Sequence, residues 1–239
     1  MLSAEIICYG DSWFVHPRAN LTSELDNIHA LQPILVLAEG GLEASDMVDH
    51  QQRYLGMFRQ ALIDYSGTLQ RVYLSAGGND FAGWDDFAHI LLADCSGCTT
   101  PAACFDLVKM QILFEQIFGD LATLITLVQK YTPNAQVRLH NYDYAIPNGK
   151  VLIGQGKWLK VPMDLRKVPN DGNLARGGFR REVVATLIDT FGHWQNDLAA
   201  KYPNVIFRQT AGTIIDSQWV DELHASGRGF KKLAQIFAG

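Results

Sequence analysis

Five short apolar runs, separated by much longer helical patterns, limit most strongly what this chain can fold into. The runs are rich in β-branched or aromatic residues and are bounded by turn residues, which is typical of buried strands; they are residues 5–9, 34–37, 71–75, 136–140 and 204–208. Helical periodicity follows between and after them, chiefly over residues 45–64, 105–131, 180–201 and beyond 228. Such alternation predicts an α/β fold, a flavodoxin-like three-layer α/β/α sandwich with about five parallel strands and helices on both faces.

The size and charge of the chain narrow the function classes. With 239 residues, 48% of them hydrophobic, and a formal net charge of −5, the chain is expected to form one domain over residues 1–239. No basic stripe indicates nucleic-acid binding, and no apolar run approaches a membrane span. The N-terminal residues show no signal-peptide pattern. Both cytoplasmic and exported locations stay open, and the sequence does not indicate the oligomeric state.

A long irregular stretch, residues 148–177, interrupts the strand–helix alternation. It is locally basic, because Lys and Arg outnumber Asp there, and it also contains Trp158, Leu159 and Met163. Loops of this length in a compact domain are usually functional or mobile. We therefore expect either a cap or substrate loop over a site, whose basic residues Lys157 and Lys160 could bind an anionic group of a substrate, or a solvated insertion without a role.

Three of the four cysteines share one short segment. Cys8 lies in an apolar run and is expected to be buried. Cys95, Cys98 and Cys104 are either three reduced thiols or include a disulfide between Cys95 and Cys104. A zinc site usually takes a fourth ligand and a second pair of ligands, and neither is evident in the sequence. No metal and no cofactor are therefore expected.

Polar residues stand just past the ends of predicted strands, where ligands bind in open parallel sheets. Ser12 follows the first strand in Gly10-Asp11-Ser12, and Asn79 follows the third in Gly77-Gly78-Asn79-Asp80. Near the C-terminus, His224 comes three residues after Asp221, close enough to donate an orienting hydrogen bond to its carboxylate. Each motif alone is common, but together they place a nucleophile, an amide donor and a base at one edge of the sheet.

With these motifs the sequence resembles the GDSL/SGNH hydrolases from position 10 to position 230. Gly10-Asp11-Ser12 matches the first block of that family, Gly77-x-Asn79-Asp80 the third and Asp221-x-x-His224 the last. The second block departs from the family pattern, since residues 39–44 read EGGLEA. In register, Ala44 stands where the family has its donor glycine, and Glu39 stands where it has asparagine.

The resemblance implies a serine esterase or lipase-like hydrolase acting on a small-molecule ester through an acyl-enzyme. It implies Ser12 as the nucleophile, His224 as the general base and Asp221 as the residue that orients it. The oxyanion would be bound by the Ser12 N–H, the Asn79 side chain and the N–H of Ala44, with Gly41 as the alternative donor.

Other residues near these motifs receive weaker assignments. Trp13 and His16 follow the nucleophile, and Asn141 and Tyr144 follow the fourth strand, so these four are predicted to line the substrate site. Asp11 and Asp80 are predicted to be structural hydrogen-bond acceptors in turns.

Three other functions fit the same sequence. The same residues would serve an acyltransferase that passes the acyl group to an alcohol. A metal-dependent phosphodiesterase could use Asp11, Asp80 and His224. A non-catalytic module could bind a carbohydrate or lipid without turnover.

Overall fold

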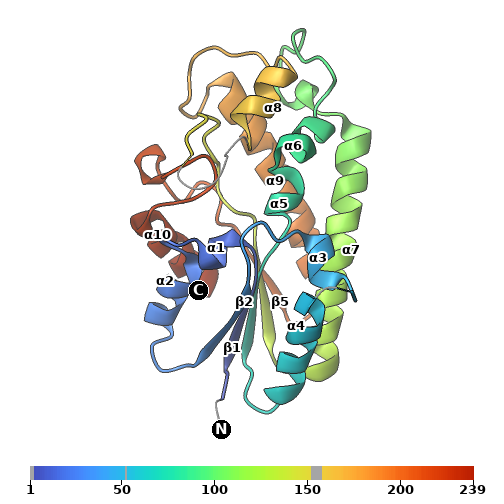
Figure 1. Cartoon of the computed structure of the whole chain (residues 1–239), viewed down its shortest axis with the longest axis vertical. Coiled ribbons are helices and arrows are strands. Elements are labelled where there is room, and N and C mark those ends of the chain that lie inside the picture. The colour runs from blue at the N-terminus through green and yellow to red at the C-terminus, as the bar shows by residue number, and fades with distance from the viewer. Residues whose placement is uncertain (1–2, 52, 152–157) are drawn as a thin grey trace.

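The computed structural model describes residues 3–51, 53–151 and 158–239, and its centre is a five-stranded parallel sheet (Figure 1). The strand order is β2-β1-β3-β4-β5, and each predicted strand is confirmed to within one residue at either end. The strands are β1 (Ile6–Gly10), β2 (Ile34–Ala38), β3 (Arg71–Ser75), β4 (Gln136–His140) and β5 (Val205–Arg208).

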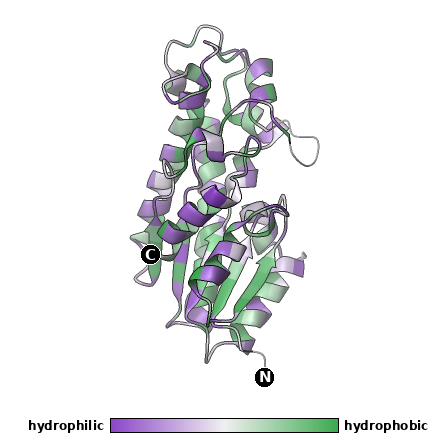
Figure 2. Ribbon diagram, turned by 90° about the vertical axis from the view of Figure 1, so that its left-hand side faces the viewer, coloured by the Kyte–Doolittle hydropathy of each residue, from purple (hydrophilic) through white to green (hydrophobic). Residues whose placement is uncertain are grey.

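Helices cover both faces of the sheet, which confirms the three-layer α/β/α architecture. One face carries α1 (Ser12–Val15), α2 (Leu21–Ile28) and α10 (Gly227–Ala238), and α2 packs against the other two. The other carries α3 (Ala44–Val48), α4 (Arg53–Asp64), α7 (Leu107–Tyr131) and α9 (Phe179–Ala199). Figure 2 shows the strands as hydrophobic segments between helices with hydrophilic outer positions, the pattern expected for a sheet buried on both sides.

Shorter helices stand in the connections above the carboxyl ends of the strands. They are α5 (Gly78–Phe81), α6 (Trp84–Ile90), α8 (Lys160–Leu165) and the 3₁₀ helices η1 (Pro101–Cys104) and η2 (Asp216–Gln218). The single helix predicted over residues 45–64 is wrong in one respect, since α3 ends at Val48 and α4 begins at Arg53. Between them the Asp49 carboxylate accepts the Gln51 N–H at 2.8 Å, a local turn that competes with helix continuation.

The long helix α7 belongs to the protein core. Among the described residues it is the one helix whose length and composition would allow it to cross a membrane. Its inner side is buried at Phe114, Ile117, Leu121 and Leu124, where α7 packs on α3 and α9. Leu107 and Ile112 lie on the same helix and are exposed.

The predicted cap segment, residues 148–177, is only partly irregular. Residues 152–157, and with them the basic Lys157, lie outside the described residues. The rest includes α8, which packs against α6 and buries Leu159 and Met163. Lys160 pairs with Asp164 through an N–O distance of 2.6 Å, so its charge is partly compensated within the segment.

Candidate active site

The turn after β1 brings Ser12 to the carboxyl edge of the sheet. Gly10 ends β1 and pairs in register with Ala38 of β2 and Ser75 of β3. A side chain at position 10 would place its Cβ 2.0 Å from the Ser75 carbonyl oxygen, so only glycine fits between the strands. Asp11 then caps α1 by accepting the Trp13 N–H at 3.0 Å. Ser12 is thereby fixed at the first position of a helix.

Ser12, His224 and Asp221 form one chain of hydrogen bonds, although 212 residues separate the first two. Ser12 Oγ lies 2.9 Å from Nε2 of His224. The other ring nitrogen, Nδ1, lies 3.0 and 3.1 Å from the two carboxylate oxygens of Asp221. If Nδ1 carries the proton and donates to Asp221, Nε2 is left as an acceptor for the serine hydroxyl proton.

The Asp221 carboxylate is buried but well supplied with donors. It is only 1% exposed, and burial by itself raises its pKa, but hydrogen bonds outweigh that effect and hold the pKa below its ordinary value. The donors are the His224 ring and the backbone N–H groups of Leu223 and His224, at 2.9 and 2.8 Å. Asp221 is therefore suited to remain ionised beside the imidazole.

The loop after β2 and the start of α5 form the opposite wall of the site. A Cβ on Gly40 would lie 3.9 Å from the Ser12 Cβ, so this loop passes directly beside the nucleophile. Asn79 in α5 donates a side-chain N–H to the Leu42 carbonyl at 2.9 Å. That bond fixes the amide and leaves its second N–H available, since a carboxamide has two donors.

The structure does not leave the Ala44 N–H available as an oxyanion donor. Ala44 is fully buried, and its N–H donates to the Asp80 carboxylate at 3.0 and 3.2 Å. Burial raises the pKa of Asp80 to about 7, against the lowering effect of this hydrogen bond. Gly41 is placed differently: it has φ of +84°, and no hydrogen bond involves its N–H within the described part of the chain. Gly41, the alternative donor named from the sequence, therefore has an unused N–H.

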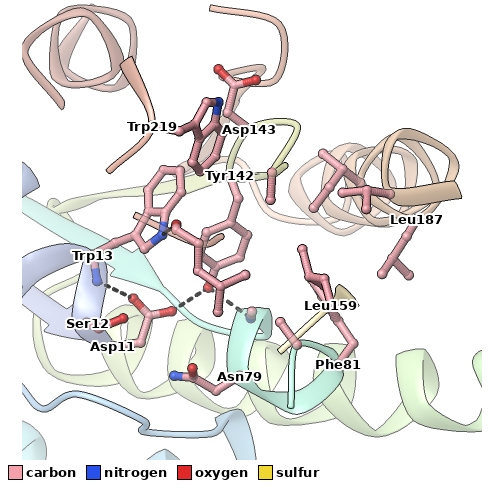
Figure 3. Close-up of a pocket in the computed structure, with 16 residues that line it drawn as sticks. Asp11, Ser12, Trp13, Asn79, Phe81, Tyr142, Asp143, Leu159, Leu187 and Trp219 are labelled. Carbon is pink, nitrogen blue, oxygen red and sulfur yellow. Dashed lines mark hydrogen bonds between the residues drawn. The ribbon is translucent and has the colours of Figure 1, made fainter. Parts of the chain in front are cut away.

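A buried polar network lies directly beneath the Ser12 turn. Asp11 accepts hydrogen bonds from the Ser75 hydroxyl at 2.8 Å and the Tyr142 hydroxyl at 2.6 Å (Figure 3 shows the latter). The Tyr142 oxygen in turn accepts the Gly78 N–H at 3.0 Å. Asp11 is thus a structural hydrogen-bond acceptor, as the sequence predicted. Its partners Ser75 and Tyr142 were not predicted.

His140 extends this network and is neutral. Burial lowers its pKa to about 3. Nδ1 accepts the Tyr142 N–H at 3.1 Å, so Nε2 carries the proton and donates to Ser75 Oγ at 3.0 Å. Tyr142 has φ of +62°, an uncommon conformation for a residue with a side chain. Its strained backbone is held by these contacts.

The four weaker substrate assignments have different outcomes. Trp13 lines the pocket beside Ser12, and His16 stacks on the His224 ring at a centroid distance of 4.2 Å. Asn141 does not line the pocket: it is 0% exposed and binds Gln209 and Thr210 on the strand-β5 side. Tyr144 is bound to Asp189 at 2.6 Å and borders a separate hollow, so neither side chain faces the nucleophile.

The pocket that opens beside Ser12 is mostly apolar. Figure 3 shows Trp13, Tyr142 and Trp219 on one side of it, with Leu159 and Leu187 across from them. Polar groups gather at its base, where Ser12 and Asn79 lie. The apolar walls come from Phe81, Ala82, Ala145, Leu159, Val184, Leu187, Ile188, Trp219 and Leu223.

Comparison with solved structures defines the class of fold. A protein assigned to the SGNH hydrolases, from Slackia heliotrinireducens, matches with 11% identity and a TM-score of 0.60, covering 100% of both chains. An extracellular lipase from Streptomyces rimosus matches with 16% identity and a TM-score of 0.58, covering 96% of both. A family 3 carbohydrate esterase from Clostridium thermocellum matches with 14% identity and a TM-score of 0.51, covering 98% of this chain and 93% of its own.

The chain therefore has the fold of the SGNH hydrolases over its whole length. No protein-family model matches the chain, and no curated protein sequence matches it. At these low identities the structural likeness establishes the fold, and the chemistry rests on the residues of the site.

Proposed function

We propose that this protein is a serine-dependent hydrolase of carboxylic esters. The observation that carries the proposal is the hydrogen-bonded chain from Ser12 Oγ through the His224 ring to the buried Asp221 carboxylate. A serine hydroxyl is a weak nucleophile until an adjacent base removes its proton, and a carboxylate behind the base orients it and stabilises the imidazolium. The three groups are arranged in that order, and Ser12 lies at the base of the apolar pocket.

In the proposed reaction Ser12 Oγ attacks the ester carbonyl carbon while His224 Nε2 takes the hydroxyl proton. The tetrahedral intermediate collapses as its C–O bond to the alcohol breaks and His224 returns the proton to the leaving oxygen. Water, deprotonated by His224, then attacks the acyl-serine, and the carboxylic acid leaves with Ser12 restored.

The developing oxyanion would be bound by three N–H donors. These are the backbone N–H of Ser12 at the start of α1, the backbone N–H of Gly41, and the free N–H of the Asn79 amide. Fixed donors of this kind stabilise charge that appears only in the transition state. The Asn79–Leu42 hydrogen bond supports the assignment because it holds the amide before substrate arrives.

The substrate class follows from the walls of the pocket. Aliphatic side chains from α9, with Leu159 and the aromatic ring of Phe81 from α5, line the pocket apart from Trp13. Such a surface favours an apolar acyl chain over a charged one. The proposed substrate is a carboxylic ester whose acyl group is a short or medium aliphatic chain.

The test is hydrolysis of p-nitrophenyl esters of increasing acyl length by the wild type and by Ser12→Ala. The proposal predicts turnover that passes through an optimum in chain length and is lost in the variant. Ser217→Ala is a matched control outside the proposed machinery and should keep full activity. EDTA should leave the rate unchanged, whereas a metal-dependent hydrolase would be inhibited. Equal turnover by wild type and Ser12→Ala would contradict the proposal.

A further inference from the structure

Three thiols that are spread over ten residues of sequence gather at one point in the connection between α6 and α7. Any two of the sulfur atoms of Cys95, Cys98 and Cys104 lie within 4.8 Å of each other. All four cysteines of the chain lie within the described residues and are free thiols there, so the disulfide considered between Cys95 and Cys104 is not formed. We call Cys95, Cys98 and Cys104 the thiol cluster.

The backbone around the thiol cluster is closed and fixed. Leu91 and Phe105 form an antiparallel bridge, and the Leu92 N–H donates to the Cys104 carbonyl at 2.9 Å. Within the loop, the Cys98 N–H donates to the Cys95 carbonyl at 2.9 Å, which forms a tight turn through Ser96 and Gly97. The 3₁₀ helix η1 then delivers Cys104 to the same side. The convergence of the thiols is therefore built into the loop.

We propose that the thiol cluster is a binding site for one zinc ion. Three sulfur ligands about 2.3 Å from a shared zinc would lie about 3.8 Å apart in a tetrahedron, which the observed limit of 4.8 Å accommodates with a small contraction. Cys95 and Cys104 are fully buried, whereas Cys98 is partly exposed. A water molecule at the partly exposed Cys98 would supply the fourth ligand.

Zinc binding would change the charge of the cluster. Binding removes a proton from each of the three thiols and forms three sulfur–zinc bonds, so the site carries one net negative charge. Two basic residues adjoin the loop from the end of α8. The Cys95 N–H donates to the carbonyl of Arg166 at 2.8 Å, and Lys167 pairs with Asp94 at 2.6 Å.

The proposed site lies apart from the proposed nucleophile. Figure 1 shows the α6–α7 connection beside α8 at one end of the molecule, away from α1 and its Ser12. By fixing the loop that receives the end of α8, zinc would stabilise the segment that also supplies Leu159 to the pocket wall. The inference is independent of the proposed hydrolase activity, because the metal would take no part in the reaction.

The experiment uses the full chain, reduced and treated with chelator, then titrated with Zn²⁺ and examined by native mass spectrometry. One zinc per chain is expected, with a rise in Tm on binding. Co²⁺ in its place should give the intense thiolate-to-cobalt charge-transfer absorption of a sulfur site. Cys98→Ser, which alters the least buried thiol, should lower zinc affinity by roughly 100-fold or more. Cys8→Ala removes a thiol outside the cluster and should bind zinc like the wild type.

Two results would overturn the inference. One is a Cys98→Ser variant that is folded by circular dichroism and binds Zn²⁺ as tightly as the wild type. The other is the absence of any zinc-dependent mass or cobalt absorption in the reduced wild type. A third result would assign the cluster to a disulfide instead. In that case air oxidation of the wild type removes two thiols and two hydrogen atoms, and the reduced protein binds no zinc.

Discussion

The two sides of the Ser12 turn differ in how completely their polar groups are used. Above the turn, Ser12 and Asn79 are only partly buried and keep hydrogen-bonding capacity free toward the pocket. Below it, Asp11, Ser75 and His140 are at most 2% exposed and are bonded to one another. The upper side can meet a substrate, whereas the lower side is buried and bonded within the protein.

This difference indicates how the site holds its geometry. A proposed nucleophile on a four-residue helix would be poorly fixed by that helix alone. The buried network joins β1, β3 and the loop after β4 to the same carboxylate, so the turn is tied to three separate parts of the sheet. In a low-dielectric interior such a network is rigid when all its members are satisfied.

The largest expected effect is loss of the base on the upper side. His224→Ala removes the acceptor for the Ser12 proton and should lower kcat for ester hydrolysis about 10⁴-fold or more. His193→Ala, which changes an exposed histidine on α9, should leave kcat unchanged. Steady-state kinetics on one p-nitrophenyl ester would measure both. A His224→Ala rate within tenfold of wild type would contradict the assignment.

The next effect concerns Asn79, one of the proposed oxyanion donors. Asn79→Ala removes one proposed donor and should lower kcat by roughly 10²–10³-fold with a small change in KM, because the donor acts mainly in the transition state. The better control is Asn196→Ala on α9. Asn141→Ala is unsuitable because the buried Asn141 side chain is hydrogen-bonded to Thr210. A rise in KM with an unchanged kcat would show that Asn79 contacts the substrate only in the ground state.

A smaller effect is expected below the turn. Tyr142→Phe removes the hydroxyl that donates to Asp11 and accepts from Gly78, while the ring remains. Leaving buried polar groups unpaired costs about 1–3 kcal/mol, so the free energy of unfolding should fall by that amount. The kcat should fall by only about tenfold or less. A loss of activity as large as that of His224→Ala would place Tyr142 in the chemistry and erase the distinction between the two sides.

The last effect concerns stability alone and is a dependence on pH at Asp80. Its pKa is about 7 in the folded protein and has an ordinary value of 3.8, so the folded state binds more protons between these values. This carboxyl group therefore contributes stability at low pH that is lost as pH rises through 7. Asp80→Asn keeps an acceptor for the Ala44 N–H without a titrating group. Denaturant unfolding from pH 4 to pH 8 should show the wild type losing stability relative to the variant, and parallel curves would refute this.

The sequence predicted the upper side of the site far better than the lower. The motifs around Ser12, Asn79 and His224 each follow a strand, and strand ends meet at one edge of a parallel sheet. The buried network joins side chains 64 and 131 positions apart, and no local pattern marks Ser75 or Tyr142 as partners of Asp11. For the same reason, Asn141 was predicted to line the substrate site although its amide points away from it.

The choice of oxyanion donor shows a second limit of prediction from sequence. Register with a family pattern placed Ala44 at the donor position, but the choice between Ala44 and Gly41 depends on which N–H is already used. That is decided by the Asp80 carboxylate, 36 residues further along the chain. Fold class, strand positions and the polar residues at strand ends could be predicted, whereas hydrogen-bond partners between distant segments could not.

The most direct test of the central claim is covalent labelling by a fluorophosphonate, which reacts with activated serine hydroxyls, followed by peptide mass spectrometry. The account predicts a single phosphonylated residue, Ser12, formed in proportion to the loss of esterase activity and absent in His224→Ala. Esterase activity that persists in an unlabelled protein, or a label on another serine that accounts for the lost activity, would contradict it.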